Sequence, residues 1–471
     1  MAMSRREFAR SSAAGLVLLG IGARPAEADR LPRSQVRALR DAVRGRVLTP
    51  GNSGYNAARQ VFNRRYDGVR PPAVVQVSGR ADVRAVVRWA ERFDVPLTAR
   101  SGGHAYNGAS TSRSAVVVDL RRLDGVRLAG VFATIGPGAR LIDVYAELAR
   151  SGATVPAGSC PTVRMGGLAT GGGMGLAGRE LGLTLDRVRS IDVVTADGQL
   201  RTVEGDDDLF WALRGGGGSF GLVTAFRLRV RRVRRAAYFR ITYPAASRAE
   251  ALAAWDTLAP GAPDDLTAIF SLTASTATAF GQFLGTEAEL RRIVRPLTRV
   301  PGASLSTGTS GYLALQRRWA GCADGGLAAC RDFAPEAFAG SSIYVAQRLS
   351  AAGRRAFLEA AEDGATLICD AYGGAISRVA PDATAFVHRD VRFSVQILSY
   401  APIPTARSRV RRARRRIAPY GNGGAYQNYA DPDLDGALRA YYGSNLGRLR
   451  TIKAAVDPAD RFRPAQGIRP G

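Results

Sequence analysis

The chain has 471 residues, with 66 lysine and arginine residues against 40 aspartate and glutamate residues, and a formal net charge of +26. A composition of 46% hydrophobic and 23% charged residues is that of a globular protein and excludes wholesale disorder, collagen and coiled coil. The length suits two domains, and no apolar run reaches the roughly 20 residues that a membrane-spanning helix needs.

The first residues predict an export signal. Ser4-Arg5-Arg6-Glu7-Phe8 is a twin-arginine pattern, an apolar stretch follows it, and Ala26-Glu27-Ala28 has the form of a cleavage site. The twin-arginine route carries folded proteins, which suits a protein that acquires a cofactor before export. We expect residues 1–28 to be removed by cleavage. We also expect the twin-arginine export machinery as a partner, no membrane contact after cleavage, and a secreted or periplasmic protein.

Strands and helices alternate after this signal. Pro72–Val77 and Ser114–Leu120 read as strands, whereas apolar residues recur at helical spacing from Asp82 to Phe93 and over Ala139–Arg150. This alternation predicts an α/β or α+β domain over residues 29–235.

The chain changes in character along its second half. Ile191–Val203 predicts a hairpin around an Asp-Gly turn, and residues 224–231 alternate apolar side chains with arginines, as in a half-buried strand. Residues 236–420 contain fewer glycine clusters and predict a second domain. The tail contains a helix that we expect to end at Asp457-Pro458.

The positive charge is almost all arginine, because Lys453 is the only lysine. The densest arginine runs, at 231–235 and 407–416, carry no interleaved aromatic residues. We interpret them as solvated surface and predict no nucleic-acid partner. An anionic substrate or a cell-wall polymer stays open as an alternative.

Three glycine-rich segments, Arg100–Gly103, Gly166–Gly175 and Gly215–Gly221, lie within about 120 residues. None has the pattern of a Rossmann or P-loop motif. Glycine lets the backbone approach a phosphate closely, so the segments suggest a large phosphate-bearing cofactor. On glycine content alone, tight strand connections explain them equally well.

Two reactive side chains favour the cofactor. His104 directly follows the first glycine segment, and Cys160 lies shortly before the second. A lone histidine or cysteine is usually structural. Beside two phosphate-type segments, however, an imidazole and a thiol are typical anchors for a cofactor with electrophilic carbons, such as flavin.

The motifs Arg100-Ser101-Gly102-Gly103-His104 and Gly158-Ser159-Cys160-Pro161-Thr162-Val163 together resemble the berberine-bridge-enzyme-like flavoprotein oxidases. These belong to the vanillyl-alcohol-oxidase, or PCMH-type FAD-binding, superfamily. The C-terminal motif Tyr426–Asp431 resembles the same family. The resemblance implies an α+β fold. Residues 29–235 and a returning segment, 421–471, would form a two-part PCMH-type FAD-binding domain, with an α/β substrate-binding domain at 236–420.

The resemblance also implies a cofactor, FAD, held by two covalent bonds from His104 and Cys160. No metal is expected. The residues expected to bind the cofactor are His104, Cys160, Arg100, Ser101, Gly102, Gly103, Gly166, Gly167, Thr170, Gly171, Gly172, Gly173, Gly175, Gly221, Val223 and Asn428.

The implied reaction is oxidation of an alcohol group, expected on a carbohydrate or oligosaccharide, with hydride passing to flavin N5 and O2 reduced to H2O2. Related sugar oxidases place a tyrosine base where this chain has Tyr429. A tyrosine with a pKa near 10 needs surroundings that stabilise its phenolate for this role. Asp382 and Tyr372 are candidates for a second catalytic group.

Two alternative functions remain open at this stage. A tailoring oxidase of a glycosylated secondary metabolite or an alkaloid would share the fold, whereas a basic polymer-binding protein would contain no flavin. Cys322 and Cys330 either form a disulfide or remain two thiols. Cys369 is expected to be buried, and His388 is interpreted as structural.

Overall fold

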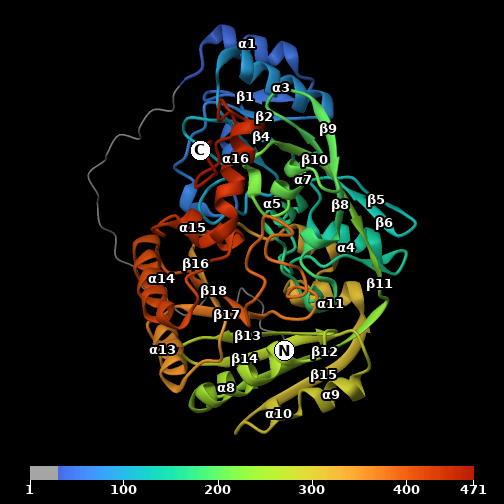
Figure 1. Ribbon diagram of the computed structural model, residues 1–471, viewed down its shortest axis with the longest axis vertical. Coiled ribbons are helices and arrows are strands. Elements are labelled where there is room, and N and C mark those ends of the chain that lie inside the picture. The colour runs from blue at the N-terminus through green and yellow to red at the C-terminus, as the bar shows by residue number, and fades with distance from the viewer. Residues whose placement is uncertain (1–29) are drawn as a thin grey trace.

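The predicted elements fold into two parts in the computed structural model, which describes residues 30–471 (Figure 1). The predicted export signal therefore lies outside the described residues. The first part contains sheets of four and five strands and a two-stranded ribbon, and the second contains one sheet of seven strands. No helix within residues 30–471 has the length and apolar character needed to cross a membrane.

The four-stranded sheet is built from short apolar strands in the order β1-β2-β4-β3. β2 and β3 both run parallel to β4, and α3 makes the connection from β2 to β3. Val83, Val86 and Ala90 of α3 are buried in one core with this sheet, which confirms the predicted helix. The bounds are α1 Arg33–Ala42, β1 Arg46–Leu48, α2 Tyr55–Arg59, β2 Val74–Gln76, α3 Arg80–Phe93, β3 Leu97–Arg100 and β4 Val116–Asp119.

The five-stranded sheet is antiparallel, in the order β5-β6-β10-β8-β9. The predicted hairpin is confirmed as β8 and β9. On β10, buried Phe226 and Leu228 alternate with exposed Arg227 and Arg229, as predicted. The bounds are β5 Val126–Ala129, β6 Phe132–Ile135, α4 Leu141–Ala149, β7 Ala153–Thr154, β8 Val188–Val194, β9 Leu200–Glu204, α7 Asp208–Leu213, β10 Leu222–Arg229 and β11 Arg231–Arg232.

The second glycine-rich segment begins as a helix rather than as a loop. α5 spans Met165–Gly171 and α6 spans Gly178–Leu181. A Cβ atom at Gly166 would lie 2.2 Å from the Ser101 hydroxyl, and one at Gly175 would lie 1.8 Å from the Ala157 carbonyl oxygen. Close packing between protein segments therefore requires glycine at these two positions.

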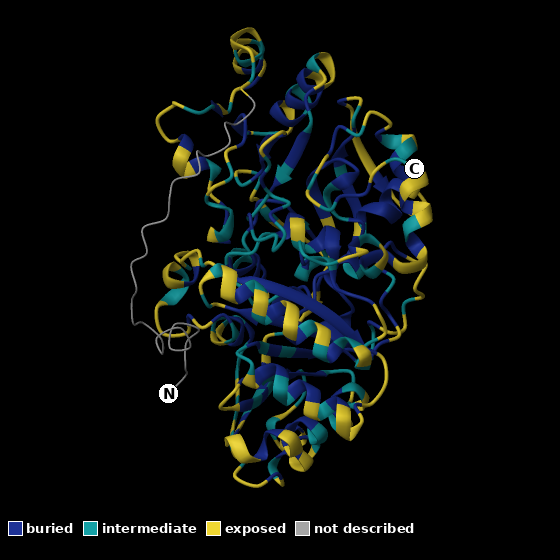
Figure 2. Cartoon of the chain, turned by 90° about the vertical axis from the view of Figure 1, so that its left-hand side faces the viewer, coloured by how far each residue is buried: buried dark blue, intermediate teal, exposed yellow. Residues whose placement is uncertain are grey.

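The seven-stranded sheet is antiparallel, in the order β15-β12-β14-β13-β17-β18-β16, with α8, α13 and α14 in the core on one face. Figure 2 shows the buried strands beneath helices whose outer faces are exposed. The bounds are β12 Arg235–Tyr243, α8 Arg248–Leu258, β13 Leu266–Leu272, β14 Ala277–Phe283, α9 Glu287–Ile293, α10 Arg295–Thr298, β15 Ser304–Gly311, α11 Tyr312–Trp319, α12 Gly326–Arg331, β16 Ala339–Val345, α13 Ala351–Glu362, β17 Thr366–Ala371, β18 Phe393–Ser399 and α14 Ile403–Ile417.

The C-terminal segment returns to the first part through α15 Ala437–Tyr442 and α16 Leu446–Val456. Lys453 is fully buried on α16, with its Nζ 2.5 Å from an Asp457 carboxylate oxygen. The same ammonium donates to the carbonyl oxygens of Ser219 and Phe462, so the buried charge is fully hydrogen-bonded and fixes the tail. The helix ends directly before Asp457-Pro458, as predicted.

Candidate active site

His104 and the segment carrying Cys160 lie side by side in the first part. The glycine turn after β3 leads to His104, whose Nε2 is 3.1 Å from the Thr162 hydroxyl, two residues beyond Cys160. The half-buried imidazole also stacks on Phe62, with ring centroids 4.0 Å apart. Two motifs more than fifty residues apart in the sequence thus meet in the structure, with the imidazole of one against Thr162 of the other.

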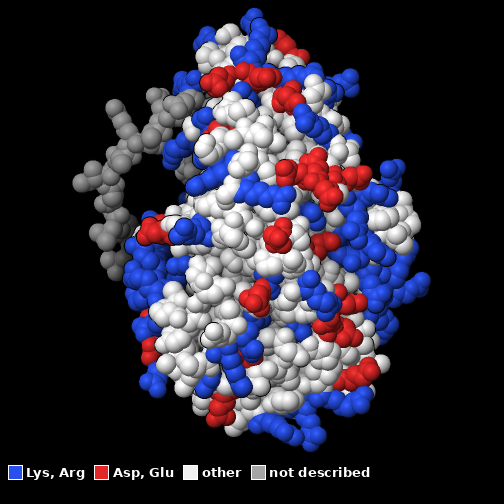
Figure 3. Space-filling view, viewed as in Figure 1, with Lys and Arg blue, Asp and Glu red and all other residues white. Residues whose placement is uncertain are grey.

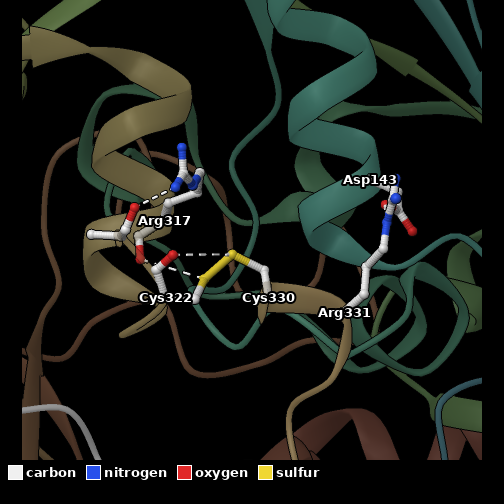
Figure 4. The surroundings of a disulfide bond; sticks show 6 residues. Asp143, Arg317, Cys322, Cys330 and Arg331 are labelled. Atoms are coloured by element: carbon white, nitrogen blue, oxygen red, sulfur yellow. Dashed lines mark hydrogen bonds and ion pairs between the residues drawn. A yellow bond between two sulfur atoms is a disulfide. The ribbon is translucent and has the colours of Figure 1, made fainter. Parts of the chain in front are cut away.

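Cys160 is the reduced cysteine with a partly accessible side chain in the described chain. Cys369 is fully buried on β17, and burial raises the pKa of its thiol well above the usual value. Cys322 and Cys330 form a disulfide, which settles the alternative that the sequence left open (Figure 4). Cys160 is therefore the thiol placed to react.

The two histidines, like the two reduced cysteines, differ in how far they are buried. Burial lowers the pKa of His388 to about 4, and its Nε2–H donates to the carbonyl oxygens of Ala440 and Tyr441. His388 is thus a neutral structural residue, as interpreted from the sequence. His104 remains as the partly accessible imidazole.

The first predicted cofactor segment is held rigidly behind His104. The Arg100 guanidinium is buried and pairs with Asp119 at 2.9 Å, which fixes the end of β3. Ser101 and Gly102 are half-buried, and a Cβ at Gly102 would lie 3.1 Å from the His104 ring. Gly103 has a φ of +73°, which favours glycine at this turn.

The second segment packs against the C-terminal motif. A Cβ at Gly171 would lie 2.1 Å from Asn428 Oδ1, and one at Gly172 would lie 2.7 Å from the Tyr426 hydroxyl. A Cβ at Gly173 would lie 2.1 Å from the Thr184 hydroxyl oxygen. The Thr170 hydroxyl donates to the Gly166 carbonyl oxygen. Gly167, by contrast, is exposed with open space on its Cβ side.

The third segment includes Gly221, with a φ of +156°. A Cβ there would lie 2.6 Å from the Val193 side chain, and Val223 is buried on β10. Packing inside the protein accounts for these two residues without a cofactor.

The partly exposed Tyr429 and the buried Asp370 form an acid–phenol pair. The Tyr429 hydroxyl donates to Asp370 Oδ2 at 3.4 Å, and the Ser394 hydroxyl donates to the same oxygen at 3.3 Å. Burial raises the pKa of Asp370 to about 7. Burial and the neighbouring Asp370 carboxylate raise the pKa of Tyr429 well above its usual value, so the phenol is protonated at neutral pH.

Tyr106 connects this pair to the imidazole. It lies two residues after His104, and its ring stacks on Tyr429 with centroids 5.8 Å apart. Gln396 on β18 donates to the Tyr106 hydroxyl. The imidazole and the acid–phenol pair therefore belong to one site at the junction of the two parts.

The structure places a different acid beside Tyr429 from the candidate named in the sequence analysis. Asp382 is exposed, and its carbonyl oxygen accepts a hydrogen bond from Trp211, so its carboxylate is not the acid beside Tyr429. Sequence reasoning missed Asp370, although it is the one charged residue in the apolar run Thr366–Ala371. A lone carboxylate in a buried strand is itself a signal of function.

Tyr372 is fully buried, and its hydroxyl lies 3.4 Å from that of Tyr344. It belongs to the same aromatic cluster as Tyr429, but it contributes to the packing behind the site.

The side chains present fit a covalently held flavin. Such a cofactor requires accessible nucleophiles, and within residues 30–471 His104 and Cys160 are the partly accessible imidazole and the partly accessible reduced thiol, on motifs that contact each other through Thr162. The same residues do not suit a metal, because no group of three metal-ligating side chains occurs within residues 30–471.

Comparison with known proteins agrees with this chemistry. A family model described as "FAD binding domain" matches residues 71–204, and one described as "Berberine and berberine like" matches residues 425–469. The uncharacterized FAD-linked oxidoreductase YgaK of Bacillus subtilis is 31% identical over 445 residues, covering 90% of this chain and 97% of its own. The chitooligosaccharide oxidase of Gibberella zeae is 30% identical over 431 residues, with coverage of 85% and 87%.

Solved structures share the fold over almost the whole length. Physcomitrella patens BBE-like 1 has a TM-score of 0.87 at 30% identity, covering 92% of this chain and 98% of its own. The glucooligosaccharide oxidase of Acremonium strictum, whose structure reveals a novel flavinylation, has a TM-score of 0.86 at 26% identity, with coverage of 94% and 100%. The expected α+β fold with a PCMH-type FAD-binding domain is confirmed, and FAD is the cofactor. A flavin-free binding protein does not agree with these findings. The chain belongs to the berberine-bridge-enzyme-like FAD-linked oxidases of the PCMH superfamily.

Proposed function

We propose that the protein oxidises an alcohol group of a carbohydrate or oligosaccharide, with Tyr429 and Asp370 handling the proton. The observation that carries this proposal is the hydrogen bond from the Tyr429 phenol to the buried Asp370 carboxylate. The likeness to a chitooligosaccharide oxidase and a glucooligosaccharide oxidase supports the substrate class.

FAD is held in this proposal by covalent bonds from His104 and Cys160. When bound, it supplies the acceptor for the substrate's hydride and then passes the electrons to O2, which leaves as H2O2. Thr162 orients the imidazole through its contact with Nε2. The exposed Gly167 leaves room for the cofactor beside α5, whose glycines let Asn428 approach the helix.

Proton removal follows from the electrostatics of the acid–phenol pair. A protonated phenol is a poor base, because burial holds the pKa of Tyr429 well above its usual value. The ionised Asp370 carboxylate accepts the phenolic proton while Tyr429 Oη takes the proton of the substrate hydroxyl. The pair thereby accepts one proton without a free phenolate forming first.

The proposal includes the domain organisation and the cellular location of the enzyme. Residues 29–235 and 421–471 form the FAD-binding domain, residues 236–420 the substrate-binding domain, and residues 1–28 a twin-arginine signal for a secreted or periplasmic enzyme. The Cys322–Cys330 disulfide supports an oxidising compartment.

Two measurements test the proposal. The intact mass of the denatured protein should exceed the mass of the chain by one FAD, and a screen of oligosaccharides should yield H2O2. An unmodified mass from yellow protein would contradict the covalent bonds. A flavin that no oligosaccharide reduces would contradict the substrate class.

A further inference from the structure

Arginine is concentrated on two surfaces of the structure, and these surfaces differ in how acidic residues compensate their charge. On α14, Arg407 pairs with Asp433 at 2.6 Å and Arg412 pairs with Asp363 at 3.1 Å. Arg416 pairs with the same Asp363 and with Glu359. Acidic neighbours therefore compensate much of the charge on this helix, as expected for an ordinary solvated surface.

The second concentration of arginine lies on the outer face of the five-stranded sheet. Direct cross-strand partners share a face of a sheet, and here one row crosses all five strands. The row comprises Arg127 on β5, Thr134 on β6, Arg227 on β10, Ser190 on β8 and Glu204 on β9.

Other guanidinium groups extend this row along the strands. Arg229 follows Arg227 on the same face, and the Arg187 guanidinium donates to the Arg229 carbonyl oxygen at 3.1 Å. Arg189 is exposed where the pairing of β8 with β10 is irregular. We call these six residues the outer arginine face: Arg127, Arg187, Arg189, Arg227, Arg229 and Arg231.

Acidic residues compensate this face poorly. Within residues 30–471, Arg231 pairs with Glu180, but Arg187, Arg189, Arg227 and Arg229 have no acidic side chain within 4.0 Å. Burial, together with the guanidinium groups of Arg229, Arg189 and Arg231, lowers the pKa of Arg187, and the opposing effect of Glu180 does not outweigh this repulsion between cations. Figure 3 shows a broad basic surface on the side where Figure 1 places β5, β6, β8 and β11.

The chemistry between the arginines favours a sugar polymer over a nucleic acid. Thr134 places a hydroxyl group next to Arg227, and Arg127 lies two strand spacings from Arg227, at about 10 Å. Phe132, the aromatic residue paired with Arg229, is covered by the Arg227 guanidinium at 4.1 Å. A base therefore has no open ring to stack on, whereas a carboxylate has forked donors.

We propose that the outer arginine face binds an acidic polysaccharide through its carboxylate groups. This inference goes beyond the proposed oxidation and does not depend on the flavin anchors. Such a face would keep an oxidase of sugars on a polymer surface while its site acts on free chain ends, with affinity that falls as salt screens the charges.

The test uses the purified flavoprotein and fluorescently labelled polygalacturonate, with binding followed by anisotropy at 50 and 200 mM NaCl. One variant replaces Arg127, Arg189, Arg227 and Arg229 by Gln. A matched control replaces the α14 residues Arg409, Arg411, Arg412 and Arg415 by Gln, which removes the same charge. We expect the first set to weaken binding about tenfold or more and the control to change it less than about twofold.

Neutral dextran and an oligothymidylate serve as further probes. Equal losses in the two variants would overturn the proposal, because net charge alone would explain binding. Tighter binding of the oligothymidylate than of polygalacturonate at equal salt, or no binding of polygalacturonate at 50 mM NaCl, would overturn it too. If removal of Arg227 destabilises the sheet by uncovering Phe132, Arg127→Gln with Arg189→Gln should still weaken binding severalfold at an unchanged melting temperature.

Discussion

The two halves of the site differ in how the chain assembles them and in their electrostatics. The anchor pair, His104 and Cys160, is partly accessible and comes from two contiguous motifs of the first part. The acid–phenol pair, Tyr429 and Asp370, is assembled from the C-terminal segment and β17 of the seven-stranded sheet. Burial there raises both pKa values, so the second pair holds protons where the first presents nucleophiles.

This contrast shows what each half requires of the fold. Nucleophiles that attach a cofactor need access, and short motifs with glycine turns supply it locally. A proton acceptor with a pKa near neutrality needs a low-dielectric environment, which only the packing of two distant segments creates. We therefore expect catalysis to be more sensitive to the loss of one atom from the acid–phenol pair than to the loss of one atom from the anchor pair.

Removing the Tyr429 hydroxyl should have the largest effect. Tyr429→Phe should slow reduction of the flavin by an oligosaccharide about 10²- to 10⁴-fold, because the proton acceptor at the substrate is lost. Flavin content should stay the same, since the anchor pair is untouched. Stopped-flow absorbance under anaerobic conditions measures the rate.

Tyr372→Phe is the matched control, because Tyr372 lies in the same aromatic cluster and is hydrogen-bonded to Tyr344. Its flavin reduction rate should stay within about threefold of the original. A loss as large as that of Tyr429→Phe would show that the two phenols act together.

The second change removes the acceptor behind the phenol. In the unaltered protein the reduction rate should rise with pH up to about 7 and then level off, because only the ionised Asp370 carboxylate accepts the proton from Tyr429. Asp370→Asn should lower the plateau rate about tenfold to a hundredfold and abolish the step near pH 7.

The substitution Asp370→Asn should also change how the free energy of unfolding depends on pH. Burial raises the pKa of Asp370 from 3.8 to about 7, so ionisation of this residue costs stability as pH rises across that range. Asp370→Asn should remove this part of the pH dependence, and Asp382→Asn should change neither profile, since Asp382 is exposed. A step near pH 7 that persists in Asp370→Asn would assign the titration to another group.

The anchor pair should tolerate single changes better. His104→Ala or Cys160→Ala should each leave one bond, so the flavin stays with the denatured chain, whereas the double variant should release it. The pH step near 7 should survive in both single variants, because Asp370 is unchanged. Flavin that remains attached to the denatured double variant would show that other residues carry the bonds.

The parts predicted correctly from sequence depend on local patterns. The helix at Arg80–Phe93, the hairpin of β8 and β9 and the helix before Asp457-Pro458 each follow from periodicity or from a turn residue. The contact of His104 with Thr162 brings together two glycine-bounded motifs that the sequence had singled out.

The acid beside Tyr429 was not identified from the sequence because its position depends on tertiary pairing. Asp382 and Asp370 lie twelve residues apart, and only the register of β17 with β13 and β18 shows which of them is buried beside Tyr429. Several glycines expected at the cofactor, Gly171 and Gly173 among them, are required by contacts with Asn428 and Thr184. Glycine content alone does not show whether the segment that packs closely against a glycine belongs to the protein or to a phosphate group of the cofactor.

Removal of the disulfide has the smallest expected effect, and it tests whether the two halves of the site respond independently. Cys322 and Cys330 pack with Ile142 of α4, whose N–H donates to the Pro161 carbonyl oxygen beside Cys160. Next to them, the Arg331 guanidinium pairs with Asp143 at 2.7 Å.

Replacing both cysteines by serine should lower the free energy of unfolding by about 2 kcal/mol, because the bond closes a short loop. The melting temperature should fall by about 5 °C. Because the disulfide packs against α4, whose Ile142 is hydrogen-bonded to Pro161, hydrogen exchange should quicken around residues 140–164 and stay unchanged around Asp370. Faster exchange around Asp370 as well, or a shift of the pH step in the flavin reduction rate, would mean that the two halves are structurally coupled.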